Sequence, residues 1–139
     1  MVLEPGAGGL AFLIGRLLFG GVLAFMGLNH FSGVDGMSGY AEAKGVPAPR
    51  LAVLGSGALL IAGGIAVALG IYPLVGAALL AAVFLAVTPV MPDFWTVADP
   101  EQRQSELTDF LKNAGLFGTA LVLAALSVTA WPYALNVGL

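Results

Sequence analysis

The sequence predicts an all-α protein, a four-helix transmembrane bundle with two longer polar connections on one side of the membrane. Two observations predict this fold. Of the 139 residues, 59% are hydrophobic and only 9% are charged, whereas a soluble domain averages about 25% charged residues because its surface faces water. The chain also contains four apolar segments of the roughly 20 residues that a helix needs to cross a bilayer. We therefore expect residues 1–139 to form a single membrane domain.

The four expected spans follow one another with connections of unequal length. They cover about Gly9–Phe31, Leu51–Gly70, Tyr72–Met91 and Phe110–Trp131. So few residues separate the second span from the third that the two should form a tight helical hairpin. An acidic residue, Glu4, and no basic one precedes the first apolar run, so we expect a retained span there and not a cleaved signal peptide.

Small residues spaced four apart recur in these spans. The pairs are Gly20 with Ala24, Ala58 with Ala62, Gly64 with Ala68, and Ala78 with Ala82. Such pairs let helix backbones approach closely, which drives association in lipid. They favour packing within one bundle, and the sequence leaves a homo-oligomer open as the alternative.

The two longer connections are polar. The first, Ser32–Arg50, ends in Gly-Val-Pro-Ala-Pro, which cannot be helical because proline disfavours helix in the preceding residue. Its middle, Met37–Lys44, is suited to a short interfacial helix. In the second, Pro92–Asp109, the pair Asp99-Pro100 is a favourable helix start, so an amphipathic turn should lead from there into the fourth span.

Four spans place both longer connections on the same side of the membrane. That side carries nearly all the basic residues, namely Lys44, Arg50, Arg103 and Lys112. The positive-inside rule then predicts a multi-pass protein of the cell membrane whose longer connections are cytoplasmic and whose termini lie outside.

Composition narrows the possible chemistry. The chain has no cysteine, which removes thiolate nucleophiles, disulfide exchange and iron–sulfur ligation by thiolates. One histidine and scattered acidic residues disfavour a self-contained zinc site, and we predict no metal. A formal charge of −3 argues against nucleic acid as a partner.

Arg16 is the one charged residue well inside the first expected span. It lies roughly seven residues in, or about 10 Å at 1.5 Å per residue. An ionisable group at such a position costs a few kcal/mol on insertion scales and is a candidate for function. The alternatives are packing within the bundle, or an arginine that snorkels to the near interface and anchors lipid headgroups.

Polar and aromatic residues from three helices converge at the connection-side interface. Asn29 and His30 end the first span, Asp93 and Trp95 end the third, and Asn113 opens the fourth. Taken singly, each is typical of an interfacial hydrogen-bonding or aromatic-belt residue. Together they lie at the same expected depth in the membrane, and ligand sites in helix bundles are built from side chains of facing helices in this way. Aromatic and apolar walls with the hydrogen-bond donors of this cluster suit a flat, lipophilic ligand such as a quinone.

Several motifs occur in a fixed order along the chain. They are Gly-Arg-Leu-Leu-Phe-Gly-Gly (15–21), Asn-His-Phe (29–31), Tyr40 with Lys-Gly-Val-Pro-Ala-Pro (44–49), Asp-Phe-Trp (93–95) and Phe-Leu-Lys-Asn (110–113). This ordered set resembles the DoxX-like family of four-helix integral membrane proteins. The resemblance extends over nearly the whole chain and adds Tyr40 to the candidate ligand-binding residues.

The chain departs from that family at two places. Pro92 stands where many relatives have a histidine, and Gly55-Ser56-Gly57 stands where some have an acid. Both departures weaken the case that this chain keeps any catalytic or metal-binding role that the histidine and the acid serve in those relatives.

The resemblance implies a redox-associated membrane role, because the family takes its name from a subunit linked to quinone-dependent sulfur oxidation. We therefore expect a quinone-linked membrane subunit, or a partner of a redox system, that is not an enzyme in isolation. Quinone would be its non-covalent cofactor, and a soluble or membrane-bound protein would supply electrons. The alternative is a non-enzymatic scaffold that docks a soluble protein through the longer connections. Intramembrane polar groups are too few to favour a transporter of charged substrates.

Overall fold

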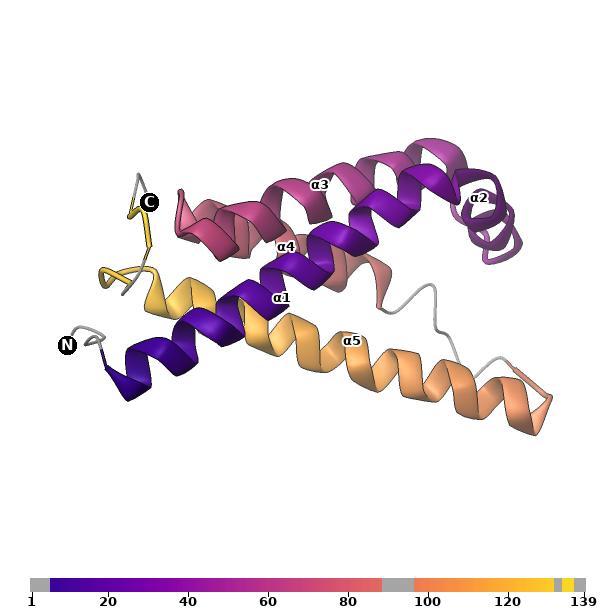
Figure 1. Cartoon of the computed structure of the whole chain (residues 1–139). Coiled ribbons are helices and arrows are strands. Elements are labelled where there is room, and N and C mark those ends of the chain that lie inside the picture. The colour runs from indigo at the N-terminus through magenta and orange to yellow at the C-terminus, as the bar shows by residue number, and fades with distance from the viewer. Residues whose placement is uncertain (1–5, 89–96, 132–133, 137–139) are drawn as a thin grey trace.

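The computed structural model describes residues 6–88, 97–131 and 134–136, and it confirms the all-α fold within them. The helices are α1 (Ala7–Ser32), α2 (Val34–Ala43), α3 (Pro49–Leu69), α4 (Pro73–Val87) and α5 (Pro100–Leu126). Figure 1 shows that α2 and the first turns of α5 lie at one end of the bundle, which we call the connection end. The start of α1, the α3–α4 turn and residues 134–136 lie at the other, which we call the terminal end.

Among the described residues, α1, α3 and α5 are long and apolar enough to cross a membrane. Helices α1 and α3 begin and end within two residues of the expected spans. Helix α4 is equally apolar but has 15 residues. The end of the third expected span, up to Met91, lies outside the described residues.

Helix α5 begins well before Phe110, where the fourth span was expected to start. Its first residue is Pro100, and the Asp99 side chain accepts a hydrogen bond of 3.4 Å from the backbone N–H of Gln102. This is the N-cap geometry that the Asp-Pro pair predicts. The polar second connection therefore continues into the apolar span as one helix.

Helix α5 also ends earlier than expected, at Leu126 and not at Trp131. The hydroxyls of Ser127 and Thr129 donate to the carbonyls of Ala124 and Leu126, at 2.6 and 2.9 Å. Such local side-chain bonds compete with the helical ladder. The chain consequently leaves the helix, and Trp131 turns back onto the bundle.

The tight hairpin between α3 and α4 is confirmed. Gly70 ends α3 in the left-handed conformation, with φ 73°, which glycine adopts without a Cβ clash. Pro73 occupies the first turn of α4, where its missing N–H costs no hydrogen bond.

Glycines bring the backbones of α1 and α3 into direct contact. A Cβ on Gly64 would lie 2.4 Å from the carbonyl oxygen of Gly20, and one on Gly27 would lie 2.5 Å from that of Gly57. Two of the expected small-residue pairs thus pack within the bundle, as close approach in lipid requires. The other pairs, Ala58 with Ala62 and Ala78 with Ala82, lie on exposed faces.

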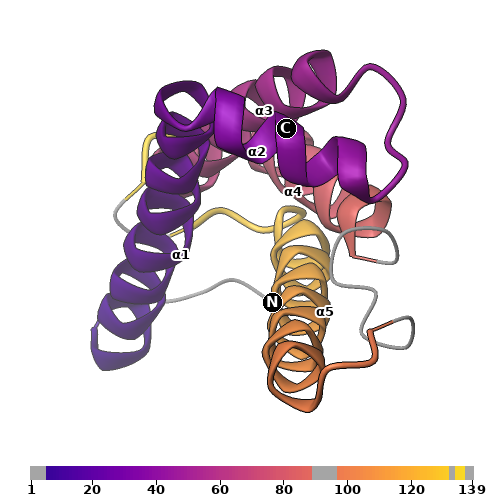
Figure 2. The same ribbon diagram turned by 90° about the vertical axis from the view of Figure 1, so that its right-hand side faces the viewer.

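The helices pack in the order α1, α3, α4 and α5, and α2 crosses the connection end (Figure 2). The buried core runs through this stack and is formed by Leu23, Leu60, Val67, Ala77, Leu80, Val83, Phe84, Ala120, Leu123 and Trp131. Many large apolar side chains face outward instead, for example Phe25 and Leu18, each 62% exposed. This is the surface expected of a protein that contacts lipid.

Candidate functional site

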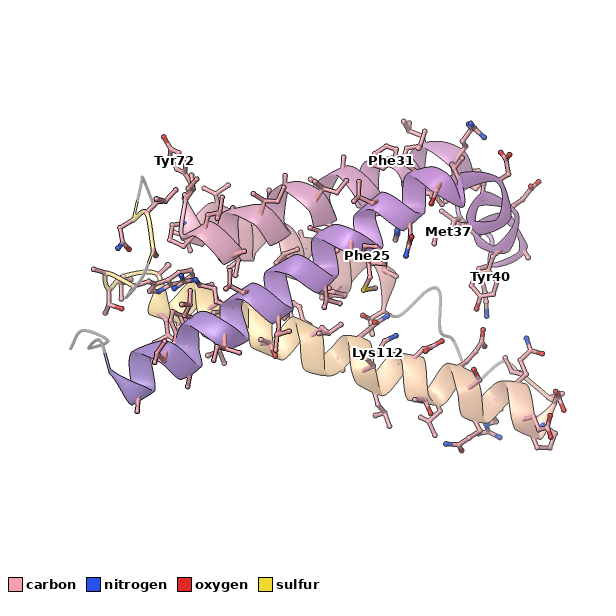
Figure 3. All side chains as sticks on the ribbon, in the orientation of Figure 1. Phe25, Phe31, Met37, Tyr40, Tyr72 and Lys112 are labelled. Carbon is pink, nitrogen blue, oxygen red and sulfur yellow. The ribbon has the colours of Figure 1, made fainter. Side chains whose placement is uncertain are left out.

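Helix α2 directs one face toward the rest of the bundle. Met37, Tyr40, Ala41 and Lys44 follow the helical spacing of a single stripe. Ala41 is buried, and Tyr40 projects from α2 toward α5 (Figure 3). Helix α2 therefore lies over the bundle as a cover, close to where the sequence predicts an interfacial helix.

Tyr40, Lys44 and Glu106 form a cluster between α2 and α5. The Tyr40 hydroxyl donates to Oε1 of Glu106, and the Lys44 ammonium donates to the same oxygen at 2.7 Å. The side chains of Lys44 and Glu106 are only 12% and 6% exposed. Taking both charges out of water is costly, and the pair is retained because each charge meets its opposite. The cluster fastens helix α2 to helix α5.

The cluster changes the acidity of Tyr40, which lies outside the spans. Burial is the largest cause and raises the pKa of its hydroxyl above the ordinary value of 10.0, and the hydrogen bond to Glu106 acts in the same direction. The Lys44 charge opposes both effects. Tyr40 is therefore held in its neutral, hydrogen-donating form.

Glu106 is the member of this cluster that the sequence analysis did not single out. It sits in a polar run that indicates a solvated helical turn. A signal was nevertheless present, because α-helical periodicity places Glu106 on the same face as Phe110, Asn113 and Phe117, which are all at least half-buried. The buried face of the fourth span thus extends one helical turn toward the N-terminus, where the buried side chain is that of Glu106.

A cavity of about 780 Å³ lies beneath α2 at the connection end. Its walls come from the end of α1, from α2 and the loop after it, and from α3 and α4. Most of the lining is apolar, and the polar side chains in it are His30, Tyr40 and Ser56. Its size and its ratio of apolar to polar groups are those of a small-molecule site.

His30 is held in the cavity wall by its own helix and by α3. Its Nδ1 lies 2.7 Å from the carbonyl oxygen of Met26, one helical turn earlier. A Cβ on Gly57 would lie 2.6 Å from the His30 Cβ. Glycine at this position of α3 therefore makes the space that the imidazole occupies.

The structure brings together only some of the residues in the expected site. His30 and Tyr40 line the cavity. Asn29 is exposed, and Asn113 is half-buried on α5; neither is among the residues that line the cavity. Asp93 and Trp95 lie outside the described residues.

Arg16 lies at the terminal end and is 2% exposed, so its head group is inside the bundle. It does not snorkel to the interface. Its Nε–H donates to the carbonyl of Ala68 at 3.1 Å, near the C-terminus of α3, where carbonyls lack helical partners and attract cations. The guanidinium carbon lies 5.5 and 5.6 Å from the ring centroids of Phe12 and Trp131. These contacts join α1, α3 and the segment after α5.

Among the described residues, no three histidine or acidic side chains are grouped so that they could hold a metal ion. A family model, DoxX, matches residues 11–97 of the chain. The match covers α1 to α4 and includes His30 and Tyr40, whereas Glu106 and Asn113 lie beyond it. Neither the curated proteins nor the solved structures give a significant match.

Proposed function

The chain belongs to the DoxX family and is a membrane protein, and from this premise we propose that it serves as a quinone-linked membrane subunit of a redox system. The observation that carries the proposal is the cavity of about 780 Å³ at the connection end. We place the lipophilic ring of the ligand in this cavity, beneath α2.

Size, lining and location support this placement. Small-molecule sites are typically about 300–1,000 Å³ and mostly apolar, with a few polar groups that orient the ligand. Here His30, Tyr40 and Ser56 supply such groups on three different helices. Quinones dissolve in the bilayer, so a cavity between membrane helices is within their reach.

The proposal also requires a redox partner. The chain has no cysteine, so it offers no thiolates for an iron–sulfur cluster. Electrons would be exchanged between the quinone and a separate soluble or membrane-bound protein. The chain alone would bind the quinone without turning it over.

The test compares two phenylalanine variants of α4. Ala78 and Ala82 are both exposed and lie about one helical turn apart, but only Ala82 lines the cavity. After purification in mild detergent, solvent extraction should recover quinone from the wild type and from Ala78→Phe. Ala82→Phe fills the cavity and should retain at least about tenfold less, as a loss of 1.4 kcal/mol gives. Absence of quinone from the wild type, or equal retention by both variants, would refute the proposal.

A second candidate function rests on the start of α5. Residues 98–105 are exposed throughout and carry both signs of charge. They offer a polar surface on which a soluble protein would dock. A scaffold of this kind would co-purify with a stoichiometric partner and without quinone. Arg103→Glu should then release the partner, whereas Ala82→Phe should retain it.

A further inference from the structure

The cavity beneath α2 continues between α3 and α4, which are not equally close along their length. Near the hairpin the two helices touch, and a Cβ on Gly63 would lie 2.9 Å from the carbonyl oxygen of Gly76. Ser56 and Val83 lie seven residues nearer the connection end, on the same helix faces as these glycines, and both line the cavity. The faces that touch near the hairpin are therefore separated farther along, where α3 and α4 diverge (Figure 1). We call this gap between Ser56 and Val83 the wedge.

The wedge opens onto the outer surface of the bundle. Leu59 lines its α3 side and follows Gly57 by two residues, or about 200° around the helix. Gly57 packs against α1, so Leu59 points away from α1. Leu59 and, on the α4 side, Ala82 are both exposed, whereas their neighbours Leu60 and Val83 are buried. The cavity therefore reaches the surface between Leu59 and Ala82, on a face where a membrane protein contacts lipid.

The polarity of the lining changes along the cavity. His30 and Tyr40 supply polar groups at the connection end. The Ser56 hydroxyl, farther in, donates to the carbonyl of Val53 in its own helix at 3.1 Å. Leu59 is the middle residue of α3, which has 21 residues, so it lies at the depth of the hydrocarbon core. A cavity that is polar near the membrane surface and apolar at mid-depth matches an amphiphile with a polar head and a long apolar tail.

We propose that the ligand is a long-tailed quinone whose tail leaves the cavity through the wedge, between Leu59 and Ala82, into the lipid. This inference rests on the proposed function, which supplies the quinone ring, and it adds the tail and its route. The cavity extends along α3 from Ala52 to Leu59, or about 10 Å at 1.5 Å per residue. A tail that crosses one leaflet, about 15 Å of hydrocarbon, needs an exit from such a cavity. The same opening admits the ligand directly from the bilayer.

The experiment compares two quinones that share a ring and differ in the tail. The full chain in lipid nanodiscs is titrated by calorimetry with decyl-benzoquinone and with methyl-benzoquinone, and empty nanodiscs give the partition blank for each. The wild type should bind both. Expressed against the quinone concentration in the bilayer, the two affinities should agree within about threefold, because a tail that leaves the protein exchanges one apolar surrounding for another.

The decisive variant narrows the wedge and leaves the connection end of the cavity unchanged. Leu59→Trp should weaken decyl-benzoquinone binding at least about tenfold through steric exclusion of the tail, and should leave methyl-benzoquinone binding within about twofold. Leu69→Trp is the matched control, because Leu69 lies on the same helix, is similarly exposed (42% against 38%) and is not among the residues that line the cavity.

A second pair of variants repeats the comparison from α4. Ala82→Leu narrows the wedge from the opposite side and should also weaken the decyl form selectively, by about threefold or more. Ala78→Leu, about one helical turn away and outside the lining, is its control. Leu59 and Ala82 are both exposed, so the added atoms displace no buried side chain. Thermal unfolding identifies a variant that fails to fold, and the other pair then decides the matter.

Each outcome has a defined meaning. A wild type that binds the methyl form alone, or wedge variants that weaken both forms equally or neither form, would overturn the tail route and leave the quinone-linked function standing. Binding of neither form by the wild type would overturn both. A selective loss of the decyl form in Leu59→Trp and Ala82→Leu, with both forms retained in the two controls, supports both.

Discussion

The two ends of the bundle both bury charged side chains between helices, but they surround them differently. At the terminal end, the Arg16 head group is enclosed by a backbone carbonyl and two aromatic rings. At the connection end, Lys44 and Glu106 pair beside Tyr40, which also lines a cavity of about 780 Å³. The Arg16 side chain is thus buried at the terminal end, whereas the connection end has a cavity beside its charged pair.

The difference indicates which end serves stability and which can respond to a ligand. A buried charge is tolerated only when it is paired or hydrogen-bonded. Arg16 contacts the Ala68 carbonyl and the rings of Phe12 and Trp131, which do not titrate. At the connection end, Tyr40 lines the cavity and donates a hydrogen bond to Glu106, so a ligand in the cavity can act on the cluster that joins α2 to α5.

The largest expected effect follows from Arg16→Ala. Removing this side chain leaves a void and an unbonded carbonyl, so the free energy of unfolding should fall by about 3 kcal/mol. The amount of quinone that co-purifies should stay within about twofold, because the cavity is at the other end. Denaturant titration in detergent measures the free energy of unfolding, and solvent extraction measures the bound quinone.

The control for this prediction is Arg50→Ala. Arg50 pairs with Asp35 at 2.7 Å, but both side chains are exposed, and such pairs contribute about 0.5 kcal/mol or less. If the two arginine variants lost similar stability, the enclosed site at the terminal end would have no special role.

An intermediate effect is expected along the glycine contacts between α1 and α3. Gly64→Ala places a Cβ 2.4 Å from a backbone oxygen, and the forced separation of the helices should cost about 2 kcal/mol. Gly57→Ala should cost a similar amount and, because it displaces His30 from the cavity wall, should also weaken quinone binding. The two variants thus distinguish packing at the terminal end from packing that shapes the cavity.

Gly55→Ala is the matched control on the same helix. No atom lies within 4 Å of a Cβ built there, so stability should be unchanged or should rise by roughly 0.5–1 kcal/mol through helix propensity. Loss of ligand binding in Gly64→Ala without loss in Gly57→Ala would contradict the assignment of the cavity.

The fold could be predicted because its causes are local in the sequence. Apolar length indicates the helices, Pro73 marks the hairpin, and Asp99 caps α5. The predicted end of the fourth span was wrong because Trp131 is apolar and extends the hydrophobic run beyond Leu126, where α5 ends. Hydropathy does not register that Ser127 and nearby hydroxyls compete for the last helical carbonyls.

The candidate site was only partly predictable because its contacts join residues far apart in the chain. His30 could be identified from its position at a helix end. Glu106 could not, since its partners Tyr40 and Lys44 are more than 60 residues away and its neighbours in the sequence are polar. The hydrogen bond from Arg16 to Ala68 could not be predicted for the same reason, because its acceptor is a backbone carbonyl 52 residues away, and a carbonyl has no signature in a sequence.

The smallest expected effect is the alkaline titration of Tyr40. Because burial and Glu106 raise its pKa above 10.0, the neutral hydroxyl stabilises the contact between α2 and α5 fully below that pH. This contribution is lost as the pH rises through the pKa of the folded state. The stability change should be small, since Tyr40 is 44% exposed.

The tyrosinate absorbance of the wild type minus that of Tyr40→Phe should titrate above pH 10.0. Glu106→Gln should move this component to lower pH but not to its ordinary position, because burial is the larger cause. A component that titrates at or below the ordinary value would mean that the connection end is as open to water as an exposed surface, and the contrast with the enclosed Arg16 would then concern the cavity alone.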